Sequence, residues 1–350
     1  MSGSRIWAMG WGKGNSLRWI GASDVDRWLS PSEARAAIAK ALCENQAGRA
    51  GAAPRVIDRS TAAPLALMPG HFAGTVGLKA ITLVEGNPGR GMPAIQGLVL
   101  LFDQSDGRLL GAVDGPSLTT IRTAAIAGFA TSVLAAVGAS SMLLVGAGAQ
   151  GLPQVEAVLA VRPIRRLAIW NRTPEKARNL AELVAARHPE LAVEVASELR
   201  RASLLADVIT LATGAAEPLI DLEDVKAECH INAMGSYQPD RRELGSALVS
   251  AALIYADTVD GCLAEAGDLM IPIAEGRLPP GKVRALATAV PQSGPSLTVM
   301  KSVGSAIFDL ACAHRLLALS ALDERDDPTP QASAQLELAR LAATFGDKAL

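Results

Sequence analysis

The chain has 350 residues, which is too long for one compact core and predicts two domains of ordinary size. Hydrophobic residues make up 49% and charged residues 19%, a composition typical of a globular α/β protein and not of a disordered or fibrous one. The net charge of −2 provides no general attraction to nucleic acid or to an anionic membrane, so we expect small molecules and further copies of the chain as partners.

The N-terminus and the cysteines predict a cytoplasmic protein. Residues 1–18 lack the continuous apolar core and the cleavage site of a secretory signal, and we expect them to be loosely ordered. The four cysteines are scattered, with no C-x-x-C pair and no histidine at ligand spacing, so neither a disulfide framework nor a metal site is indicated. The longest apolar run, 123–137, is shorter than a membrane span and predicts a buried helix.

The first part of the chain predicts an antiparallel sheet covered by helices. Ser30 suits a helix N-cap, Pro31 suits the first turn and Glu33 suits a capping box, so a helix should run from there to about Asn45. Short apolar segments separated by glycine and proline follow. The predicted strands are 54–58, 64–68, 75–84 and a hairpin over 96–114 that turns at 104–107. Ser117 then begins a long alanine-rich helix.

The second part alternates apolar strands with helical patterns, which predicts a parallel, doubly wound sheet. Its expected strands are 142–145, 167–170, 207–213, 230–234 and 253–257. A terminal amphipathic helix over 302–322 should pack back on the first domain, followed by a polar break at 323–330 and a last helical segment. The predicted fold class is α/β, with a Rossmann-type domain over 136–305 and a separate α+β substrate domain over 1–135 that is completed by 306–350.

A glycine loop stands between the first strand and the first helix of the Rossmann-type domain. Gly146 makes the tight turn, Gly148 lets backbone approach a pyrophosphate, and Gly151 lets the helix pack closely. Ala149 and Gln150 complete the loop, and the helix N-terminus faces the phosphates. The strand–turn–helix context predicts dinucleotide binding.

The end of the second strand indicates which dinucleotide binds. A carboxylate at this position would accept both ribose hydroxyls of NAD and repel a 2′-phosphate, but the chain has Asn171, Arg172 and Thr173 there. The Arg172 guanidinium can meet a phosphate with two hydrogen bonds, which favours NADPH, with NADH still possible. The alternative is that Arg172 is an ordinary exposed arginine before a helix that begins at Pro174.

Several stretches resemble the ornithine cyclodeaminase and mu-crystallin family from residue 20 to about 322. They are Val76–Lys79, Leu118–Ala125, the glycine loop Gly146–Gly151, Gly235–Leu244 and Ala266–Leu269. The family includes ornithine and lysine cyclodeaminases, archaeal-type alanine dehydrogenases, ketimine reductases and Δ1-pyrroline-2-carboxylate reductases. The resemblance implies a homodimer in which the substrate domain makes the dimer contact.

The resemblance also implies that Arg55, Lys79 and Arg122 hold a substrate carboxylate beside the nicotinamide. Two guanidinium forks and an ammonium would fix the plane and charge of an α-imino acid, and the neighbouring arginines should lower the pKa of Lys79. Arg122 also stands out by itself, because it interrupts an apolar helix start where an unpaired charge would be costly. By the same resemblance, the cofactor is lined by Thr120, Thr213, Gly214 and the turn Ser302–Ser305, which includes Val303.

One departure indicates the branch of the family. The loop after the glycine equivalent to Gly235 carries a catalytic aspartate in the cyclodeaminases, whereas this chain has Tyr237, and Asp240 is not at the matching place. Cyclodeamination needs that base, but reduction of a ready-made cyclic imine needs only a hydride, one proton and a held carboxylate. The hypothesis is therefore NADPH-dependent reduction of Δ1-pyrroline-2-carboxylate, and also of Δ1-piperideine-2-carboxylate, to L-proline and L-pipecolate.

Two other functions stay open at this point. A cyclodeaminase or an alanine dehydrogenase-like enzyme would release or consume ammonia, so a coupled assay separates it from an imine reductase. A mu-crystallin-like, NADPH-dependent ligand-binding protein without catalysis is the non-enzyme alternative. A role on nucleic acid has no support in a basic stripe or an aromatic platform.

Overall fold

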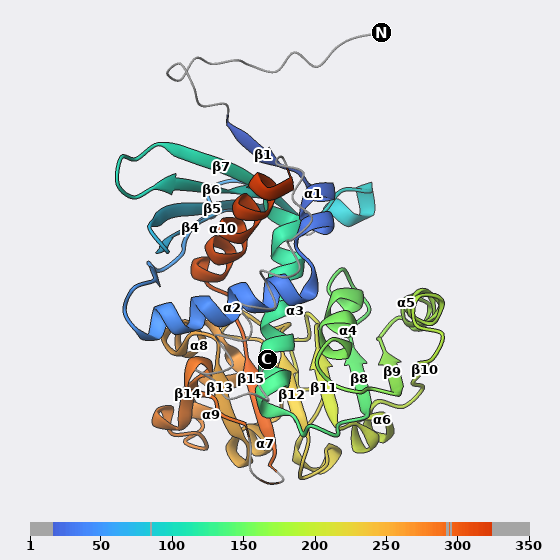
Figure 1. Ribbon diagram of the computed structural model, residues 1–350. Coiled ribbons are helices and arrows are strands. Elements are labelled where there is room, and N and C mark those ends of the chain that lie inside the picture. The colour runs from blue at the N-terminus through green and yellow to red at the C-terminus, as the bar shows by residue number, and fades with distance from the viewer. Residues whose placement is uncertain (1–16, 85, 292–293, 295, 324–350) are drawn as a thin grey trace.

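The fold is that of a computed structural model, which describes residues 17–84, 86–291, 294 and 296–323. The chain forms two sheets with their own helices, and the long helix α3 (Gly115–Leu134) runs between them (Figure 1). The predicted α/β class is confirmed. The N-terminal segment up to residue 16 and the predicted last helical segment lie outside the described residues. No helix in the described part of the chain has the length and apolar character needed to cross a membrane.

The first sheet is mainly antiparallel, as predicted. Its strands are β1 (Arg18–Ile20), β2 (Gly51–Ala52), β3 (Val56–Asp58), β4 (Leu65–Phe72), β5 (Thr75–Leu83), β6 (Ile95–Asp103) and β7 (Leu109–Asp114). Their order is β1-β7-β6-β5-β4-β2, with β3 also paired to β4. Only β1 runs parallel to its neighbour within this described sheet. The sequence places Arg18 in a loose tail, but the residue begins β1 because that strand completes the sheet beside β7.

The helices α1 (Ala22–Trp28), α3 and α10 (Ala306–Asp323) pack against this sheet, and α2 (Pro31–Gln46) packs against α3 and α10. The Ser30 hydroxyl accepts from the backbone N–H of Glu33 at 3.2 Å, so α2 begins where predicted. The predicted capping box is wrong, because the Glu33 carboxylate instead binds Arg315 of α10, with Nε and Oε2 2.6 Å apart. Helix α3 begins two residues before Ser117, whose backbone N–H donates to the capping carboxylate of Asp114 at 2.9 Å.

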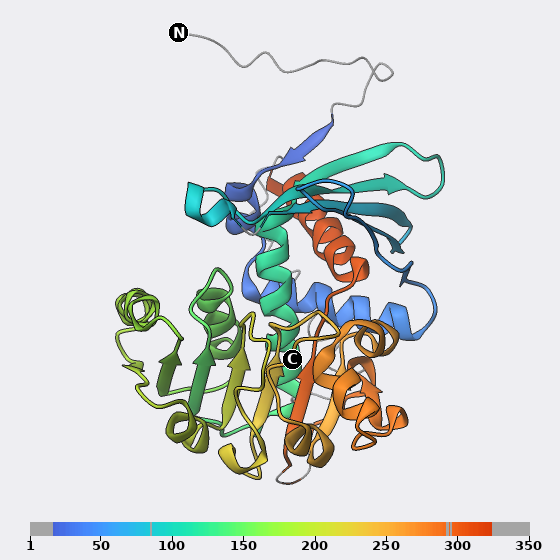
Figure 2. The same ribbon diagram turned by 180° about the vertical axis from the view of Figure 1, so that it is seen from behind.

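Helix α10 lies close against the inner face of β5, as the view from behind shows (Figure 2). The strand has no side chain at Gly77, where a Cβ would collide with Leu310 of α10. A Cβ at Gly70 of β4 would lie 3.2 Å from the same leucine. These two glycines allow the close approach of helix and sheet, which brings the buried side chains of β5 to α10.

The second sheet is entirely parallel and contains more strands than predicted. Its described strands are β8 (Ser141–Val145), β9 (Arg166–Trp170), β10 (Ala192–Val195), β11 (Val208–Leu211), β12 (His230–Ala233), β13 (Leu253–Ala256), β14 (Val283–Ala285) and β15 (Thr298–Lys301). Their order is β10-β9-β8-β11-β12-β15-β13-β14. Strands β10, β14 and β15 were not predicted, because they have only three or four residues each. The predicted domain division at residues 135 and 306 stays a prediction.

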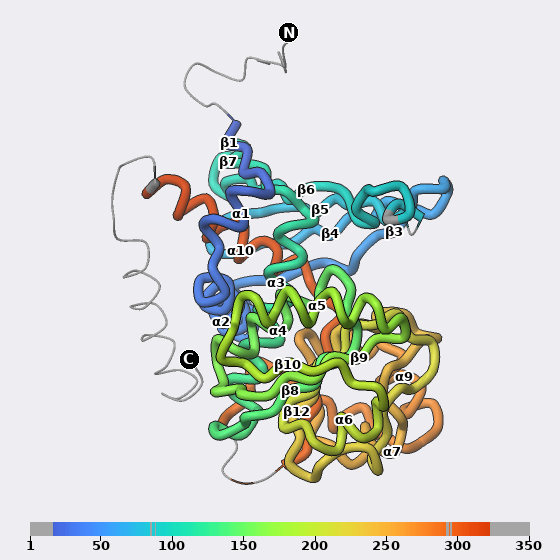
Figure 3. Tube along the Cα trace, turned by 90° about the vertical axis from the view of Figure 1, so that its right-hand side faces the viewer, coloured from blue at the N-terminus to red at the C-terminus, as the bar shows by residue number. Residues whose placement is uncertain are grey.

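Helices cover both faces of the second sheet, as a doubly wound fold requires (Figure 3). Met142 and Leu144 of β8 pack with α4 and α5, whereas Leu143 and Val145 pack with α6 and α7 on the opposite face. The helices are α4 (Gly151–Leu159), α5 (Pro174–Arg187), α6 (Leu199–Leu205), α7 (Ser246–Ala251), α8 (Val259–Glu265) and α9 (Gly267–Ala274). Short 3-10 turns lie at Asn87–Arg90, Leu222–Asp224, Pro280–Lys282 and Leu286–Thr288.

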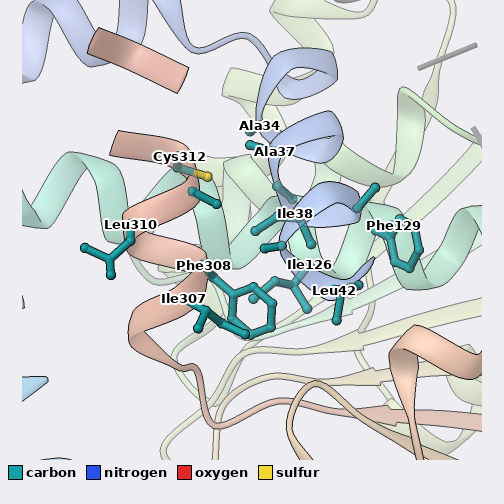
Figure 4. Close-up of a cluster of buried hydrophobic side chains, with 14 of the residues drawn as sticks. Ala34, Ala37, Ile38, Leu42, Ile126, Phe129, Ile307, Phe308, Leu310 and Cys312 are labelled. Atoms are coloured by element: carbon teal, nitrogen blue, oxygen red, sulfur yellow. The ribbon is translucent and has the colours of Figure 1, made fainter. Parts of the chain in front are cut away.

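One hydrophobic core joins the two halves of the chain. Side chains of α2, α3 and α10 meet there, including Ile38, Ile126 and Phe308 (Figure 4). The same cluster contains Met300 of β15 and Tyr255 of β13, which belong to the second sheet. The position of α10 is therefore fixed by apolar contacts with both halves.

A buried polar network fastens α3 to the second sheet. The ring of His230 on β12 forms hydrogen bonds with Thr298 at 2.9 Å and with Asn232 at 3.1 Å. The Asn232 amide donates to Thr131 of α3 at 2.9 Å. Burial lowers the pKa of His230 to about 3, so its ring is neutral at physiological pH.

We expect His230 to make the protein less stable as the pH falls. In the unfolded chain His230 takes up a proton near pH 6.5, but in the folded chain it does so only near pH 3. The contribution of His230 to the free energy of unfolding is therefore fully present above pH 6.5 and is lost progressively as the pH falls below it. The free energy of unfolding should fall by up to about 1.4 kcal/mol per pH unit through this group. Urea titrations between pH 7 and pH 5 measure this slope. The His230→Gln variant should show a shallower slope, and an unchanged slope would refute the assignment.

Candidate active site

The glycine loop leaves the carboxyl end of β8 with the geometry that its sequence predicts. Gly146 has a φ of +108°, and a Cβ there would lie 2.5 Å from the carbonyl oxygen of Ala212, so glycine is required. A Cβ at Gly148 would meet no atom within 4 Å, which leaves its backbone open to a ligand. Ala149 is exposed and Gln150 is the N-cap of α4.

Gly151 permits a contact that differs in detail from the predicted one. Its Cβ would lie 2.7 Å from Leu180 of α5 and 3.6 Å from Leu144 of β8. The tightest packing at this glycine is therefore between two helices, and the contacts with the loop carbonyl of Gly146 and with the strand are looser. These contacts hold the N-terminus of α4 at the loop.

At the end of β9, one of the three predicted cofactor residues is already bonded within the chain. Asn171 Oδ1 accepts from the backbone N–H of Ala147 at 3.0 Å, and its Nδ2 donates to the carbonyl of Thr173 at 2.9 Å. Asn171 therefore ties the glycine loop to β9. Arg172 and Thr173 are exposed, and Arg172 forms no ion pair within the described residues. This guanidinium is available to an anionic group.

A buried glutamate joins the loops that follow β11 and β12. Glu243 Oε1 accepts from the backbone N–H and the hydroxyl of Thr213 at 2.9 and 2.6 Å. Its Oε2 accepts from the backbone N–H groups of Gly235 and Ser236 at 2.9 and 3.3 Å. Burial raises the pKa of Glu243, against the effect of the nearby Lys301 ammonium. The predicted cofactor residue Thr213 is thus held in place by an acid that the sequence analysis did not single out.

Lys79 and Arg122 meet on one carboxylate. Lys79 lies on the inner face of β5 and is only 1% exposed. Its Nζ lies 2.9 Å from Asp309 Oδ1 of α10, and Arg122 Nε of α3 lies 3.1 Å from the same oxygen. Asp309 is fully buried, and its Oδ2 has no hydrogen-bond partner within the described residues. Three elements that are distant in sequence thus share one ionic cluster.

Burial has opposite effects on the pKa values of the two charge types in this cluster. It lowers the pKa of Lys79 to about 8; Asp309 opposes this shift, while Arg122 and Arg55 add to it. The predicted direction is correct, but burial contributes more than the neighbouring arginines. Burial raises the pKa of Asp309, but the charges of Arg122 and Lys79 outweigh it and hold that pKa below its usual range.

The guanidinium groups of Arg122 and Arg55 meet at Gly304, in the loop that follows β15. Gly304 has a φ of +78°, and a Cβ there would lie 2.8 and 3.0 Å from Nη1 and Nη2 of Arg122. Arg55 Nη2 donates to the carbonyls of Val303 and Gly304 at 3.1 and 2.9 Å, and its Nε lies 3.0 Å from Glu265 Oε1. Because β15 is parallel to β12, this loop lies at the carboxyl edge of the second sheet, where such folds bind ligands.

The structure therefore brings Lys79, Arg122, Arg55 and Val303 together. Thr120 lies two residues before Arg122, and its hydroxyl donates to the carbonyl of Pro116 in its own helix at 3.0 Å. Donors remain for a carboxylate: Arg122 Nη1 and Nη2 and Arg55 Nη1 form no hydrogen bond within the described part of the chain. Tyr237 is 43% exposed.

Sequence reasoning missed three acids of the site: Asp309, Glu265 and Glu243. Asp309 carried a usable signal, because it interrupts the apolar run from Ile307 to Ala313, where an unpaired charge would be costly. Glu265 and Glu243 carried none, since each stands in a stretch with several polar residues.

A hollow in the second half of the chain lies apart from these groups. A hollow of about 540 Å³ lies between β9, β10 and α6. Its lining includes Arg166, Glu194 and Arg201 but none of the groups described above. We place the site by its converging donors and not by volume, because the hollow lies beside an edge strand, away from the glycine loop.

These features define a dinucleotide-binding type of fold with a buried cluster of cations at the carboxyl edge of its parallel sheet. The family follows from comparison with known sequences. The chain belongs to the ornithine cyclodeaminase/mu-crystallin family, whose model matches residues 20–318. The resemblance predicted from the motifs is thereby confirmed.

Relatives in this family include reductases of cyclic imines. The chain is 36% identical over 251 residues to ketimine reductase mu-crystallin of Mus musculus, covering 71% of this chain and 78% of the relative. It is 33% identical over 312 residues to Δ1-pyrroline-2-carboxylate reductase of Bacillus thuringiensis, covering 85% and 94%. Thermococcus litoralis Δ1-pyrroline-2-carboxylate reductase, solved with NADH and L-proline, matches with a TM-score of 0.83 at 27% identity, covering 88% and 98% of the two chains.

The Gly304→Ala variant tests whether the arginines act at this loop. The added methyl group would displace the Arg122 guanidinium. We use pyrrole-2-carboxylate, a planar five-membered ring with one carboxylate, as the probe ligand, and we expect its binding to weaken at least about tenfold while dinucleotide binding is kept. Calorimetry and cofactor fluorescence measure the two affinities. Gly276→Ala is the matched control, because Gly276 has a similar φ of +70° but no atom within 4 Å of its Cβ position. Equal effects of the two variants would mean that backbone strain alone is responsible.

Proposed function

We propose that the protein is a reductase of cyclic α-imino acids that uses NADPH, with Δ1-pyrroline-2-carboxylate as the main substrate and L-proline as the product. Δ1-Piperideine-2-carboxylate, reduced to L-pipecolate, is the second proposed substrate. The observation that carries this proposal is the cluster of Lys79, Arg122 and Arg55 beside Gly304, at the edge of the sheet that bears the glycine loop. The names of the relatives support the same reaction class.

The arginines hold the substrate in the proposed reaction. The free Nη atoms of Arg122 and Nη1 of Arg55 donate to the substrate carboxylate, and the buried ammonium of Lys79 supplies a further positive charge from the inner face of β5. Arg55 offers one free nitrogen and not a full fork, because Glu265 and the loop carbonyls occupy its other donors. A carboxylate held in this way fixes the plane of the imine ring.

The reduction needs one hydride and one proton. A nicotinamide dinucleotide held at the glycine loop would supply the hydride for the imine carbon, and the imine nitrogen would take up the proton. In this proposal Lys79 donates that proton, and its pKa of about 8 allows it to be charged at neutral pH and still release a proton. Tyr237 stands where the cyclodeaminases have an aspartate, so this chain lacks the base for water attack and ammonia release at that position.

Lys79→Met is the direct test of the reaction. With NADPH and Δ1-pyrroline-2-carboxylate we expect kcat/KM to fall by about 10²-fold or more, because a charge and a proton donor are lost together. For the wild type, kcat/KM should be constant below pH 8 and decrease above it as Lys79 loses its proton. NADPH absorbance measures turnover. Ammonia release from ornithine without imine reduction would favour a cyclodeaminase, and ligand binding without turnover would favour a binding protein.

We also propose that NADPH is preferred over NADH. Arg172 is exposed at the end of β9, and the position has no carboxylate that would repel a 2′-phosphate. The relative from Thermococcus litoralis was solved with NADH, so the preference rests on the residues of this chain.

The Arg172→Ala variant should raise KM for NADPH about tenfold or more and leave KM for NADH nearly unchanged, because only the phosphate contact is lost. Steady-state rates with each cofactor measure this. Lys176→Ala, an exposed cation in the first turn of α5, is the control for a general change of surface charge. Equal losses with both cofactors would show that Arg172 does not read the phosphate.

A homodimer through the outer face of the first sheet is part of the proposal. Helices α3 and α10 cover the inner face (Figures 1 and 2). Apolar side chains line the other face. The outer-face residues, by strand register, are Val56, Leu65, Leu67, Pro69, Val76, Leu78, Ala80, Leu98, Leu100 and Phe102. Val56 and Val76 are 60% and 38% exposed in the single chain. A contiguous apolar face of this kind is typical of a subunit interface.

The Val76→Lys variant should shift the protein from dimer to monomer in analytical ultracentrifugation, because a charge would be buried between the subunits. Leu204→Lys in α6, where the leucine is 42% exposed, is the matched control and should stay dimeric. A wild type that sediments as a monomer at all concentrations would exclude the dimer.

We also propose that the protein is cytoplasmic, where its four free thiols would stay reduced.

A further inference from the structure

The buried carboxylate of Asp309 has no role in the reaction described above. Its Oδ1 accepts from Lys79 and from Arg122, while its Oδ2 is buried without a partner within the described residues. An acceptor left in this way costs about 1–3 kcal/mol, and replacing a whole buried ionic cluster by apolar side chains of similar volume is often neutral or stabilising. Stability alone therefore does not explain why the helix has an acid here.

We infer that Asp309 is a positioning residue for substrate binding, because its Oδ1 holds both the Lys79 ammonium and the Arg122 guanidinium. The far end of that guanidinium lies beside Gly304. This inference rests on the proposed function for its substrate, a small cyclic imino acid. The binding geometry itself needs only a carboxylate ligand.

The geometry shows how one oxygen can orient both cations. Arg122 donates through Nε to Asp309 Oδ1, at 3.1 Å, while its Nη1 and Nη2 form no hydrogen bond with that carboxylate in the described part of the chain. Those two atoms lie against Gly304, whose backbone N–H donates to Asp257 Oδ2 at 2.8 Å and so stays fixed. Lys79 uses one of its three N–H donors for Asp309 and keeps two for a ligand or for water.

The charge of Asp309 also decides whether the cluster can stay ionised. The titratable groups that face Lys79 are Asp309 on α10, Arg122 on α3 and Arg55 beside β3, with the buried thiol of Cys312 behind Asp309. Burial raises the pKa of Cys312, which keeps that thiol neutral. Asp309 is then the nearest anion to two buried cations, and without it the ammonium would give up its proton at a lower pH.

Asp309→Asn tests the inference, because it keeps the shape and removes the charge. We expect KM for Δ1-pyrroline-2-carboxylate and the dissociation constant of pyrrole-2-carboxylate to rise at least tenfold at pH 7. The basic limb of the kcat/KM profile should move down by at least one pH unit. A change that only loosened the packing of α10 would not move that limb.

Glu33→Gln is the matched control. Glu33 is also a buried carboxylate paired with a cation of the α10 region, Arg315 at 2.6 Å, but it lies outside the cation cluster. This variant should keep both KM and the position of the pH limb. NADPH affinity, measured by fluorescence, should stay unchanged in both variants and reports that the second sheet is folded.

A double-mutant cycle covers the case in which Asp309→Asn does not fold. The pair Lys79→Met and Lys79→Met/Asp309→Asn removes an ammonium and its anion together, which avoids one unpaired buried charge. Because Asp309 also holds Arg122 through Nε, the second change should still weaken pyrrole-2-carboxylate binding in the Lys79→Met background. A further loss of threefold or more supports the inference, and a smaller loss overturns it.

The titration of Lys79 separates this inference from the proposed reaction. The ¹³Cε shift of Lys79, assigned by its loss in Lys79→Met, should titrate at least one pH unit lower in Asp309→Asn, and no turnover is needed to observe it. If the wild type reduces no cyclic imine while this shift and the loss of carboxylate binding are found, the proposed substrate is wrong and the role of Asp309 stands. If Asp309→Asn leaves the Lys79 titration and carboxylate binding unchanged, the inference is wrong even with a fully active reductase.

Discussion

The ionic contact of Lys79 and Arg122 with one oxygen of Asp309 is the interaction on which the arrangement of the site depends. It joins β5, α3 and α10 at one buried point. A buried cation that loses its partner costs about 3–5 kcal/mol, so each of these three elements has to stay where the others place it. The glycines at 70 and 77 serve the same end, because they let α10 approach β4 and β5 closely enough for the contact to form.

Much of the framework could be predicted because its signals are local. The glycine loop, the Ser30 cap and the strand–helix alternation each depend on residues a few positions apart, and the structure bears out the fold class that they indicated. Arg122 was found by a physical rule, since a charge in an apolar helix needs a partner. The same rule applied to Asp309 would have supplied that partner from the sequence, because both residues interrupt apolar helical runs.

The remaining parts of the site depend on contacts between distant residues. Arg55 reaches the carbonyls of Val303 and Gly304 across 248 and 249 positions, and no local pattern encodes that contact. Strand β15 was not predicted because its four residues end in Lys301, and a charged residue is not expected in a buried strand. Asp268, with its carboxylate 2.7 Å from the Lys301 ammonium, makes that burial possible. The capping role given to Glu33 was wrong for the same reason, since Arg315 of a remote helix takes its carboxylate.

The place of β15 has a consequence for how the protein is made. In the sheet this strand lies between β12 and β13, although both are translated before it. A nascent chain that has emerged only as far as β14 cannot close its parallel sheet, and it has neither the Gly304 loop nor Asp309 to receive Arg122. About 310 residues therefore have to emerge from the ribosome before Lys79 and Arg122 can pair with Asp309. Completion of the sheet and assembly of the site are thus late and coupled events.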